Sequence, residues 1–323
     1  MKIGIMPSGF RIPLEEAIRK AAACGAAGVQ VNVRQPDSLM CDWSDEAIAE
    51  VAGWCRAANL EVSAVCGDVG SHDFQLDGKN MELAAQYCRT VDLAVKLNTQ
   101  VMTSHIGTVP DDPEDPTRLN MVNSIRKVAE YARSRGITMA IETGPESPET
   151  LLNFIEQVNV PGGLGVNLDP ANLRMVGSFC PVHAVKLLGK YIVHTHAKDG
   201  VNYKPGPAYA RYGIFNPDGS KRVFEGVPVP DYKEVPLGQG QVPWDEYLAA
   251  LRDAGYDGYL TIERECGDDP EADIRMAVAE QGFYPVDVPV VNYDADLING
   301  LIIGQWDGLK NYIYSIKGDR KNG

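Results

Sequence analysis

The sequence YLTIERE at residues 259–265 has the form of a short buried strand that ends in a glutamate, Glu263. Four earlier segments are also mostly apolar runs that end in a residue able to bind a metal or move a proton. They are VMTSHIG (101–107) with His105, MAIETG (139–144) with Glu142, GVNLDPAN (165–172) with Asp169 and IVHTHAKDG (192–200) with His196. In a (β/α)8 barrel the C-terminal ends of all strands open on one face, where active sites are built. The five side chains are therefore expected to meet in one pocket.

The rest of the chain has the alternation that such a barrel requires. Eight strands are predicted, at residues 2–6, 28–33, 61–65, 100–105, 138–142, 164–169, 192–197 and 258–263. Between them lie stretches with apolar residues at spacings of three and four, such as MELAAQYCRTVDLAVKL, which are typical of amphipathic helices. Eight βα units, with no GxGxxG after the first strand, favour a closed (β/α)8 TIM barrel over an open doubly wound sheet.

Two stretches depart from a minimal barrel. Residues 200–242 are rich in Gly, Pro and aromatic residues and predict a long loop after the seventh strand, on the same face as the pocket. Residues 283–323 follow a catalytic barrel domain of residues 1–282 and carry apolar residues at near-helical spacing. This C-terminal extension is expected either to pack on the barrel or to contact another subunit. We favour a subunit contact, in a homo-oligomer or with a small partner chain.

Composition limits the partners and the compartment. The 323 residues carry a net charge of −14, which argues against nucleic acid or an anionic membrane, because both require clustered Lys and Arg. The seven cysteines show no CxxC spacing, and no segment reaches the roughly 18 apolar residues of a membrane span. We expect a cytoplasmic protein with reduced thiols that acts on a small molecule.

The carboxylates at the strand ends point to a metal. Buried strands seldom end in Glu unless the charge is paired or bound to a cation. Glu142 or Glu263 alone could be a surface carboxylate or the partner of a nearby lysine. Together with Asp169 on the strand between them, they favour a divalent cation whose remaining positions are filled by substrate oxygens.

The histidines differ in their expected depth. His194 and His196 lie two residues apart, so they point to the same side of one strand. His196 is nearer the mouth of the pocket and is the better ligand, whereas His194 is expected to be a hydrogen-bonded core histidine. For His105 we favour contact with the substrate over metal ligation.

Three further residues are candidate substrate contacts. Asn172 follows Asp169 by three positions, although Asn in that place is equally often a helix cap. Glu146 follows Glu142 in the segment AIETGPE. Lys198 follows the seventh strand, and either Lys198 or Asp199 is expected to steady the metal ligands from outside.

The motifs VMTSHIG, AIETGPE, VNLDPAN, VHTHAKDG and GQGQVPWDEYLAALRDAGYDGYLTIERE, in this order, resemble the sugar-phosphate isomerase/epimerase superfamily with its xylose isomerase-like TIM barrel. The resemblance extends from the first strand to about residue 279. It implies one divalent ion held by Glu142, Asp169, His196 and Glu263, with the two glutamates also acting as the acid/base pair. We expect Mn²⁺, with Co²⁺, Mg²⁺ and Zn²⁺ as alternatives.

Two departures from relatives narrow this resemblance. Members similar to endonuclease IV hold three zinc ions with a histidine three residues after the aspartate and a later DxH motif. Asn172 stands at the first of these places and no DxH follows the seventh strand, so a trinuclear DNA-repair site is not expected. The arginine that grips the substrate in the epimerases has no counterpart, with Asn202 and Lys204 nearest to its place.

The loop and the extension resemble, more faintly, the catalytic alpha subunits of bacterial C-glycoside deglycosidases, which act on 3-oxo-glycosides with a small beta subunit. We therefore expect a metal-dependent enzyme of carbohydrate metabolism that enolises a keto-sugar or sugar derivative, with Glu142, Glu263 and His105 as catalytic residues. Return of the proton gives an isomerase or epimerase, and loss of a substituent gives a lyase, either a deglycosidase or a polyol dehydratase. The other alternative is a non-catalytic sugar-binding barrel.

Overall fold

Eight parallel strands close into a barrel in the computed structural model, which describes residues 1–279 apart from the side chains of residues 71, 72 and 279. Each strand pairs with its neighbours in the order β1-β12-β9-β8-β7-β6-β5-β2, so the predicted (β/α)8 barrel is confirmed. The barrel strands are β1 (Lys2–Ile5), β2 (Gly28–Asn32), β5 (Glu61–Cys66), β6 (Val101–Ser104), β7 (Thr138–Glu142), β8 (Leu164–Leu168), β9 (Ile192–Ala197) and β12 (Tyr259–Ile262). The predicted extension at residues 283–323 lies outside the described residues.

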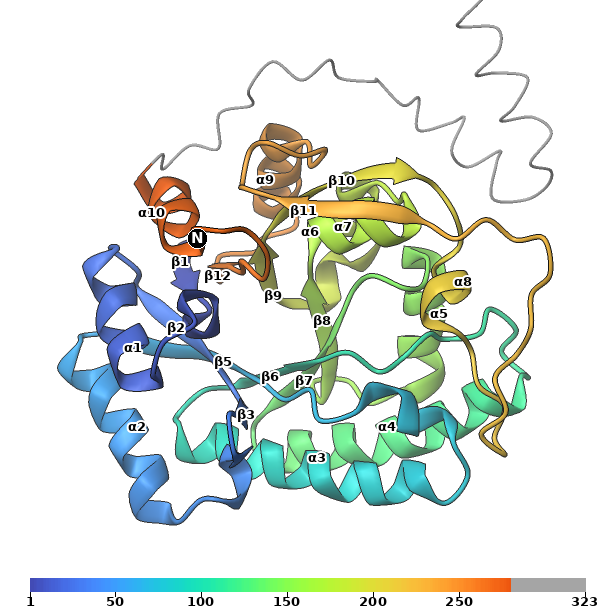
Figure 1. Ribbon diagram of the computed structural model, residues 1–323. Helices are drawn as coiled ribbons and strands as arrows, with labels where there is room; N and C mark the ends of the chain where they lie inside the picture. Colours follow the sequence, from blue (N-terminus) through green and yellow to red (C-terminus); the bar gives the residue numbers. More distant parts are fainter. Residues whose placement is uncertain (280–323) are drawn as a thin grey trace, which may run out of the picture. The chain divides into compact units, whose positions relative to one another are not determined.

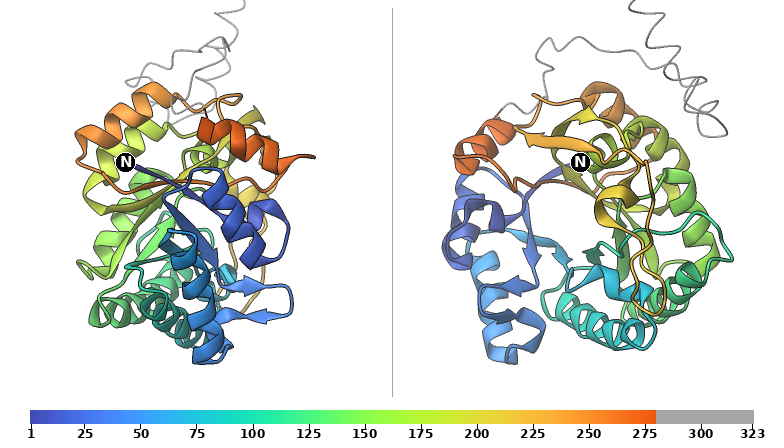
Figure 2. Two further views of the ribbon diagram at one scale, coloured as in Figure 1. Left: turned by 90° about the vertical axis from the view of Figure 1, so that its left-hand side faces the viewer. Right: turned by 45° about the vertical axis from the view of Figure 1, so that its right-hand side comes forward.

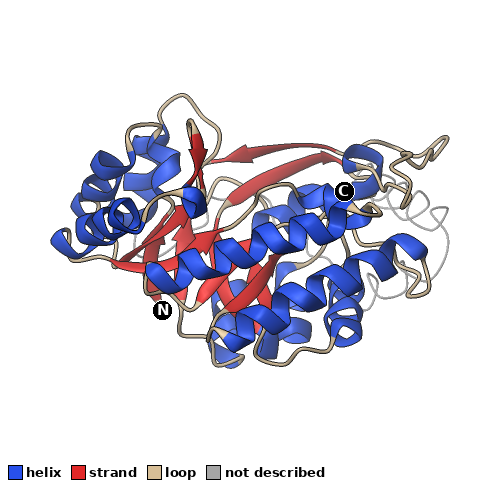
Figure 3. Ribbon diagram, turned by 90° about the horizontal axis from the view of Figure 1, so that it is seen from below, coloured by secondary structure: helices blue, strands red, loops and turns tan. Residues whose placement is uncertain are grey.

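Helices surround the strands, as Figures 1 and 3 show. They are α1 (Leu14–Ala23), α2 (Asp45–Ala57), α3 (Lys79–Lys96), α4 (Pro116–Ser134), α5 (Pro148–Val158), α7 (Pro181–Leu188), α9 (Trp244–Asp253) and α10 (Pro270–Ala279). Several begin at a side chain that accepts a hydrogen bond from a free backbone N–H group, such as Ser44 before α2 and Ser147 before α5. Such caps satisfy donors that have no partner inside the helix.

Five predicted strands end one residue earlier than expected, and three of them carry candidate site residues. His105, Asp169 and Glu263 each lie immediately beyond the last residue of β6, β8 and β12. Their side chains are therefore carried by the first residue of a βα loop, at the C-terminal face of the barrel. These three strands were predicted one residue too long, because a polar residue that follows an apolar run continues the strand pattern in the sequence.

Apolar and polar side chains occupy different parts of the barrel. The aliphatic residues of the strands, including Ile5, Val29 and Ile141, belong to a continuous hydrophobic core with residues of the surrounding helices. Other strand residues carry polar side chains with less than 1% exposure, such as Gln30 and His196. These two residues are hydrogen-bonded although β2 and β9 are not neighbours in the sheet. Their bond therefore crosses the interior of the barrel, which holds a polar layer.

The predicted loop at residues 200–242 contains regular structure. Strands β10 (Asp199–Lys204) and β11 (Asp231–Val235) form an antiparallel pair, and the short helix α8 (Ala208–Tyr212) lies between them in the sequence. Figure 2 shows this yellow-to-orange segment beside the barrel. Both strands contact the π-helical turn η4 (Leu173–Gly177), and β10 also contacts α6 (Pro170–Asn172). The abundance of Gly and Pro between the strands hid two short strands from the sequence pattern.

The remaining short elements lie in the connections between barrel strands and helices. They are the hairpin of β3 (Arg34–Gln35) and β4 (Ser38–Leu39), and the turns η1 (Pro7–Phe10), η2 (Met40–Asp42), η3 (Ser71–Gln75) and η5 (Gly189–Tyr191). Within residues 1–279, no helix combines the length and the apolar character that a transmembrane span needs.

Candidate metal centre

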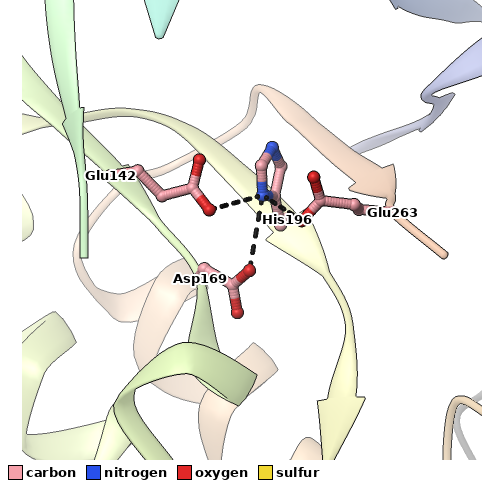
Figure 4. A group of neighbouring side chains, drawn as sticks. All are labelled: Glu142, Asp169, His196 and Glu263. Carbon is pink, nitrogen blue, oxygen red and sulfur yellow. Dashed lines mark ion pairs between the residues drawn. The ribbon is translucent and has the colours of Figure 1, made fainter. Parts of the chain in front are cut away.

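Four residues predicted as metal ligands come together at the C-terminal face of the barrel. The Nδ1 atom of His196 lies 3.5 Å from Oε1 of Glu142, 3.4 Å from Oδ2 of Asp169 and 3.2 Å from Oε2 of Glu263. One ligand atom from each residue falls within 4.8 Å of the other three. Figure 4 shows the three carboxylates directed at the same ring nitrogen. They come from the consecutive strands β7, β8 and β9 and from β12, which pairs with β9.

Two buried atoms of this group have no hydrogen-bond partner. Nδ1 of His196 and Oδ2 of Asp169 are both unsatisfied, and both residues have 0% exposure. Burying a polar atom without a partner is costly. Because the two atoms face the same point as the two glutamates, a divalent cation at that point would satisfy both, and oxygen and imidazole ligands suit such an ion.

The charges of the group also call for a cation. Burial lowers the pKa of His196, but the Glu263 and Glu142 carboxylates outweigh it and raise that pKa well above the usual value. The same excess of negative charge that would hold a proton on the imidazole can be offset by a metal ion instead. The residues present therefore fit a divalent metal.

The polar layer of the barrel orients the imidazole of His196. Its Nε2 atom lies 2.9 Å from Oε1 of Gln30, so an N–H group there can donate to the amide oxygen. The amide nitrogen of Gln30 in turn donates to Oγ1 of Thr103 at 2.8 Å. This arrangement leaves Nδ1 as the nitrogen that faces the carboxylates, and such outer partners fix the ring of a metal-binding histidine.

His194 is the core histidine that the strand spacing predicted. It has 1% exposure, and its ring nitrogens lie 2.9 Å from Oδ1 of Asn167 and 3.0 Å from Oγ1 of Thr261. Burial and the nearby His196 lower the pKa of His194 well below its usual value. Its side chain therefore stays neutral and structural, one layer below the candidate metal.

Glu142 is held by two amides. Asn172 donates through Nδ2 to Oε1 of Glu142 at 2.9 Å, and Asn167 donates to Oε2 at 3.3 Å. Asn172 does not cap a helix with its side chain: Asp169 occupies the N-cap of α6 and accepts a bond from the backbone N–H of Asn172 at 2.8 Å, and Asn172, which precedes η4, makes no side-chain cap bond. Asn172 also lines the cavity beside the metal group, where a substrate could reach it. Its role as a substrate contact stays a prediction.

Of the two residues expected to steady the metal ligands, Lys198 is the one that contacts them. Its Nζ atom lies 2.9 Å from Oε2 of Glu263 and 4.0 Å from Oδ2 of Asp169, and its side chain is 4% exposed. Burial alone would raise the pKa of Glu263, but Lys198 and His196 lower it well below the usual value. Asp199 instead accepts hydrogen bonds from the segment that follows β11.

His105 stands beside the metal group rather than in it. Its Nδ1 atom lies 3.3 Å from Oδ2 of Asp68, and its Nε2 atom lies 3.6 Å from Oε1 of Glu142. Burial lowers the pKa of His105, but Glu142 and Asp68 raise it to about 10. Its side chain is 39% exposed and lines the cavity, which is compatible with the predicted contact to substrate.

Glu146 is placed differently from the other candidates. It is 5% exposed, neither carboxyl oxygen has a hydrogen-bond partner in the described residues, and burial raises its pKa to about 8. It does not line either of the two cavities that reach Glu142 and Glu263. Its assignment as a substrate contact stays a prediction.

Two cavities, which share Glu142 and Glu263 among their lining residues, open from the metal group. One, of about 330 Å³, is lined by His105, Asn172 and Lys198, and by Tyr212 of α8. The other, of about 540 Å³, extends toward the loops after β1 and β2. A groove of about 690 Å³ between α7 and α9 carries none of the predicted site residues.

Several residues that shape the site were not predicted from the sequence. Asp68 follows β5 by two positions, and Tyr212 belongs to a segment predicted as loop. Gln30 and Asn167 are polar residues inside the largely apolar strands GVQVN and LGVNL, each between two aliphatic neighbours. A polar residue flanked by valine or leucine in a buried strand is a usable signal, because such a group requires a buried partner.

A family model described as xylose isomerase-like TIM barrel matches residues 18–280, and the chain belongs to this family. Fructoselysine 3-epimerase of Shigella flexneri is 21% identical over 278 residues, which cover 81% of this chain and 90% of that protein. An uncharacterised protein of Methanocaldococcus jannaschii is 22% identical over 213 residues, 62% of this chain and 61% of that protein. The crystal structure of a xylose isomerase domain protein from Planctomyces limnophilus has 26% identity and a TM-score of 0.65, covering 87% of this chain and 95% of that one. The resemblance drawn from the motifs is thus confirmed.

Proposed function

We propose that this protein is a divalent-metal-dependent enzyme that removes a proton next to the carbonyl group of a keto-sugar or sugar derivative and returns it, as an isomerase or epimerase does. The observation that carries the proposal is the placing of Glu142 and Glu263 on the two sides of His196 (Figure 4), beside two unsatisfied buried ligand atoms. The epimerase name of the relative from Shigella flexneri supports the same chemistry.

Each residue of the group has a role in this proposal. Glu142, Asp169, His196 and Glu263 would hold the metal, Mn²⁺ by preference. When bound, such an ion supplies Lewis acidity that stabilises negative charge on the substrate oxygens. One glutamate removes the α-proton and the other returns a proton, and a positioned carboxylate can do either.

The partners of the two glutamates suit an acid/base pair. Glu263 accepts a bond from the Lys198 ammonium at 2.9 Å, which keeps it ionised. Glu142 is held by neutral amides and faces His105 across 3.6 Å. His105 is therefore placed to exchange a proton with Glu142 or with a substrate oxygen in the cavity.

A lyase is the second candidate, and one observation favours it. His105 is held between Asp68 and Glu142 at the cavity wall, where an imidazolium could protonate a departing group. The same deprotonation would then end in loss of a substituent, as in a deglycosidase or a dehydratase. The small-subunit partner of a deglycosidase stays a prediction.

Solvent exchange tests the proposal. The full-length protein is stripped with chelator, reloaded with Mn²⁺ and incubated in deuterium oxide with a panel of ketoses and 3-oxo-glycosides. We expect one carbon-bound proton to be replaced by deuterium, detected by NMR of the recovered substrate and product. Epimerised product identifies an epimerase, and a released substituent identifies a lyase.

Absence of label in substrate and product across the panel, with metal bound, would contradict proton abstraction. In that case the sugar-binding barrel without catalysis would be favoured if the same compounds still bind. Reloading with Mn²⁺ after chelation separates loss of metal from damage to the protein.

A further inference from the structure

The larger of the two cavities continues from the metal group to two arginines. It includes Glu142 and Glu263 at one end and Arg11 and Arg34 from the loops after β1 and β2. Its volume of about 540 Å³ lies in the range of small-molecule sites. Glu142 ends β7 and the other three follow barrel strands, so all four stand on the same face as the candidate metal site.

Arg11 is held in place by the loop that carries Glu263. Its guanidinium donates to the backbone carbonyls of Glu265 at 2.9 Å and Gly267 at 3.1 Å. Its backbone has a φ of 56°, in the left-handed region that a residue with a bulky side chain seldom adopts. Arg11 is the C-cap residue of η1, and its backbone N–H bonds to the carbonyl of Ser8, so the end of this turn accounts for the angle.

The guanidinium of Arg34 makes no such hydrogen bonds. It begins the short hairpin of β3 and β4, and its side chain is exposed. Its backbone N–H bonds to Asn32, but its guanidinium makes no hydrogen bond or ion pair with another residue in 1–279. An arginine at a cavity wall whose guanidinium donates no hydrogen bond within the protein can present its N–H groups to a planar or tetrahedral oxyanion.

The other charged groups on this cavity are already engaged. Glu142 and Glu263 belong to the metal group. The rest are paired within the protein: Asp68 with His105, Glu265 with Lys198, and Arg264 with both Glu234 and Asp273. Arg34 is near enough to Asp68 to lower the pKa of that carboxylate. Arg11 and Arg34 are nevertheless the two cations of the cavity that form no ion pair with a carboxylate of residues 1–279.

We propose that Arg11 and Arg34 form a lobe that binds an oxyanion, a phosphate ester or a carboxylate, on the substrate whose carbonyl group lies at the metal group. This inference rests on the proposed function and names its substrate class, an anionic keto-sugar. The two residues nearest to the place of the epimerase arginine, Asn202 and Lys204, do not line this cavity. Asn202 is bonded to the carbonyl of Met175, and Lys204 is exposed. Arg11 and Arg34 therefore supply positive charge that the segment after β9 does not.

The test compares three matched probes on the full-length, Mn²⁺-loaded protein by calorimetry: D-fructose, D-fructose 6-phosphate and D-fructuronate. We expect at least one anion to bind about tenfold or more tightly than fructose, and this advantage to weaken with salt. Tighter binding of the phosphate identifies a phosphate ester, and tighter binding of fructuronate identifies a carboxylate.

Substitution locates the effect. Arg34→Gln should lose most of the advantage of the anion while binding fructose as the wild type does, and the double variant Arg11→Gln/Arg34→Gln should lose what remains of that advantage. Arg133→Gln is the matched control, because Arg133 is an exposed arginine on α4 outside the cavity. Circular dichroism and metal content verify that each variant is folded and loaded.

The outcomes separate the lobe from the proposed function. Equal affinity for all three probes, or an advantage that survives the double variant, overturns the lobe. If no sugar binds the loaded protein, the keto-sugar function fails, and the lobe is then judged with inorganic phosphate. Phosphate binding that is weakened by the arginine substitutions and not by Arg133→Gln supports the lobe, and any other result overturns it.

Discussion

Glu142 and Glu263 share a ligand role but differ in the partners that hold them. Glu263 accepts from the buried ammonium of Lys198, whereas Glu142 accepts from the amides of Asn172 and Asn167. A glutamine at either place would keep the size of the side chain but lose its charge. It would thereby remove a metal ligand and a proton acceptor together.

We predict that Glu142→Gln and Glu263→Gln each lower the rate of proton exchange by about a hundredfold or more, the usual range for a general acid or base. Exchange into deuterium oxide is measured by NMR with the Mn²⁺-loaded proteins. Glu130→Gln, which changes an exposed glutamate on α4, is the control for charge. A near-normal rate in either site variant, with circular dichroism unchanged, would show that the acid/base assignment is wrong.

Glu146 predicts a pH dependence of stability. Burial raises its pKa from the ordinary 4.5 to about 8, so the folded protein binds a proton that the unfolded chain releases between these values. The stability from Glu146 is thus fully present below about pH 4.5 and is lost as the pH rises to about 8. The loss amounts to at most about 1.4 kcal/mol per pH unit.

We predict that Glu146→Gln removes this pH dependence. At pH 8 and above, the variant should be more stable than the wild type by a few kcal/mol, the order of magnitude that follows from the linkage of proton binding to folding. Urea unfolding at a series of pH values provides the measurement, with Glu130→Gln as the matched exposed control. Parallel stability curves for the wild type and Glu146→Gln would contradict a buried, protonated Glu146.

At the residue level, the strand ends were the part of the site that sequence could predict. Glu142, Asp169, His196 and Glu263 are each the last residue of a strand, the one before it or the one after it, and barrel closure then brings them together. Asp68 and Tyr212 could not be predicted, because the length and course of their loops decide whether they reach the cavity. The unpaired guanidinium of Arg34 likewise becomes apparent only from three-dimensional contacts.

Among the elements, the segment between β9 and α9 depends on one buried carboxylate. Asp199 has 1% exposure and accepts hydrogen bonds from the backbone N–H groups of Gly200, Gly238, Gly240 and Val242 and from the indole of Trp244. Gly240 is required there, because a Cβ atom would collide with the Asp199 carboxylate. Asp199 thereby fixes the start of β10 to the chain that follows β11.

We predict that Asp199→Ala destabilises the protein by roughly 2–5 kcal/mol, because several buried donors lose their partner. Limited proteolysis should then cut first within residues 200–242, and thermal unfolding should show the loss of stability. Asp231→Ala, at an exposed position of β11, is the control. Unchanged resistance to proteolysis and an unchanged melting temperature would mean that Asp199 does not hold this segment.

The number and order of the elements followed from the sequence, but the insertion did not. Alternating strand and helix patterns define eight βα units, and a parallel sheet of eight such units closes. Strand β11, DYKEV, alternates polar and apolar residues weakly, and its pairing with β10 spans 26 intervening positions. That pairing is set by the tertiary contacts of Asp199 and not by local pattern.

For the whole molecule, the predicted division is a barrel at residues 1–282 and an extension at 283–323 that lies outside the described residues. The apolar residues of the extension predict a subunit contact, since a large apolar surface left in water promotes association. We predict that deleting residues 283–323 lowers the mass of the assembly measured by light scattering. An unchanged mass with intact activity would mean that the extension packs on its own barrel.

Metal content tests the proposed centre most directly. The protein is purified without chelator, stripped with EDTA and titrated with Mn²⁺, and bound metal is counted by elemental analysis and calorimetry. We predict one tightly bound ion per chain in the wild type and a loss of about tenfold or more in affinity in Asp169→Asn, which removes a charged ligand. A wild-type protein that binds no ion, or one that binds three ions per chain, would contradict the single site formed by Glu142, Asp169, His196 and Glu263.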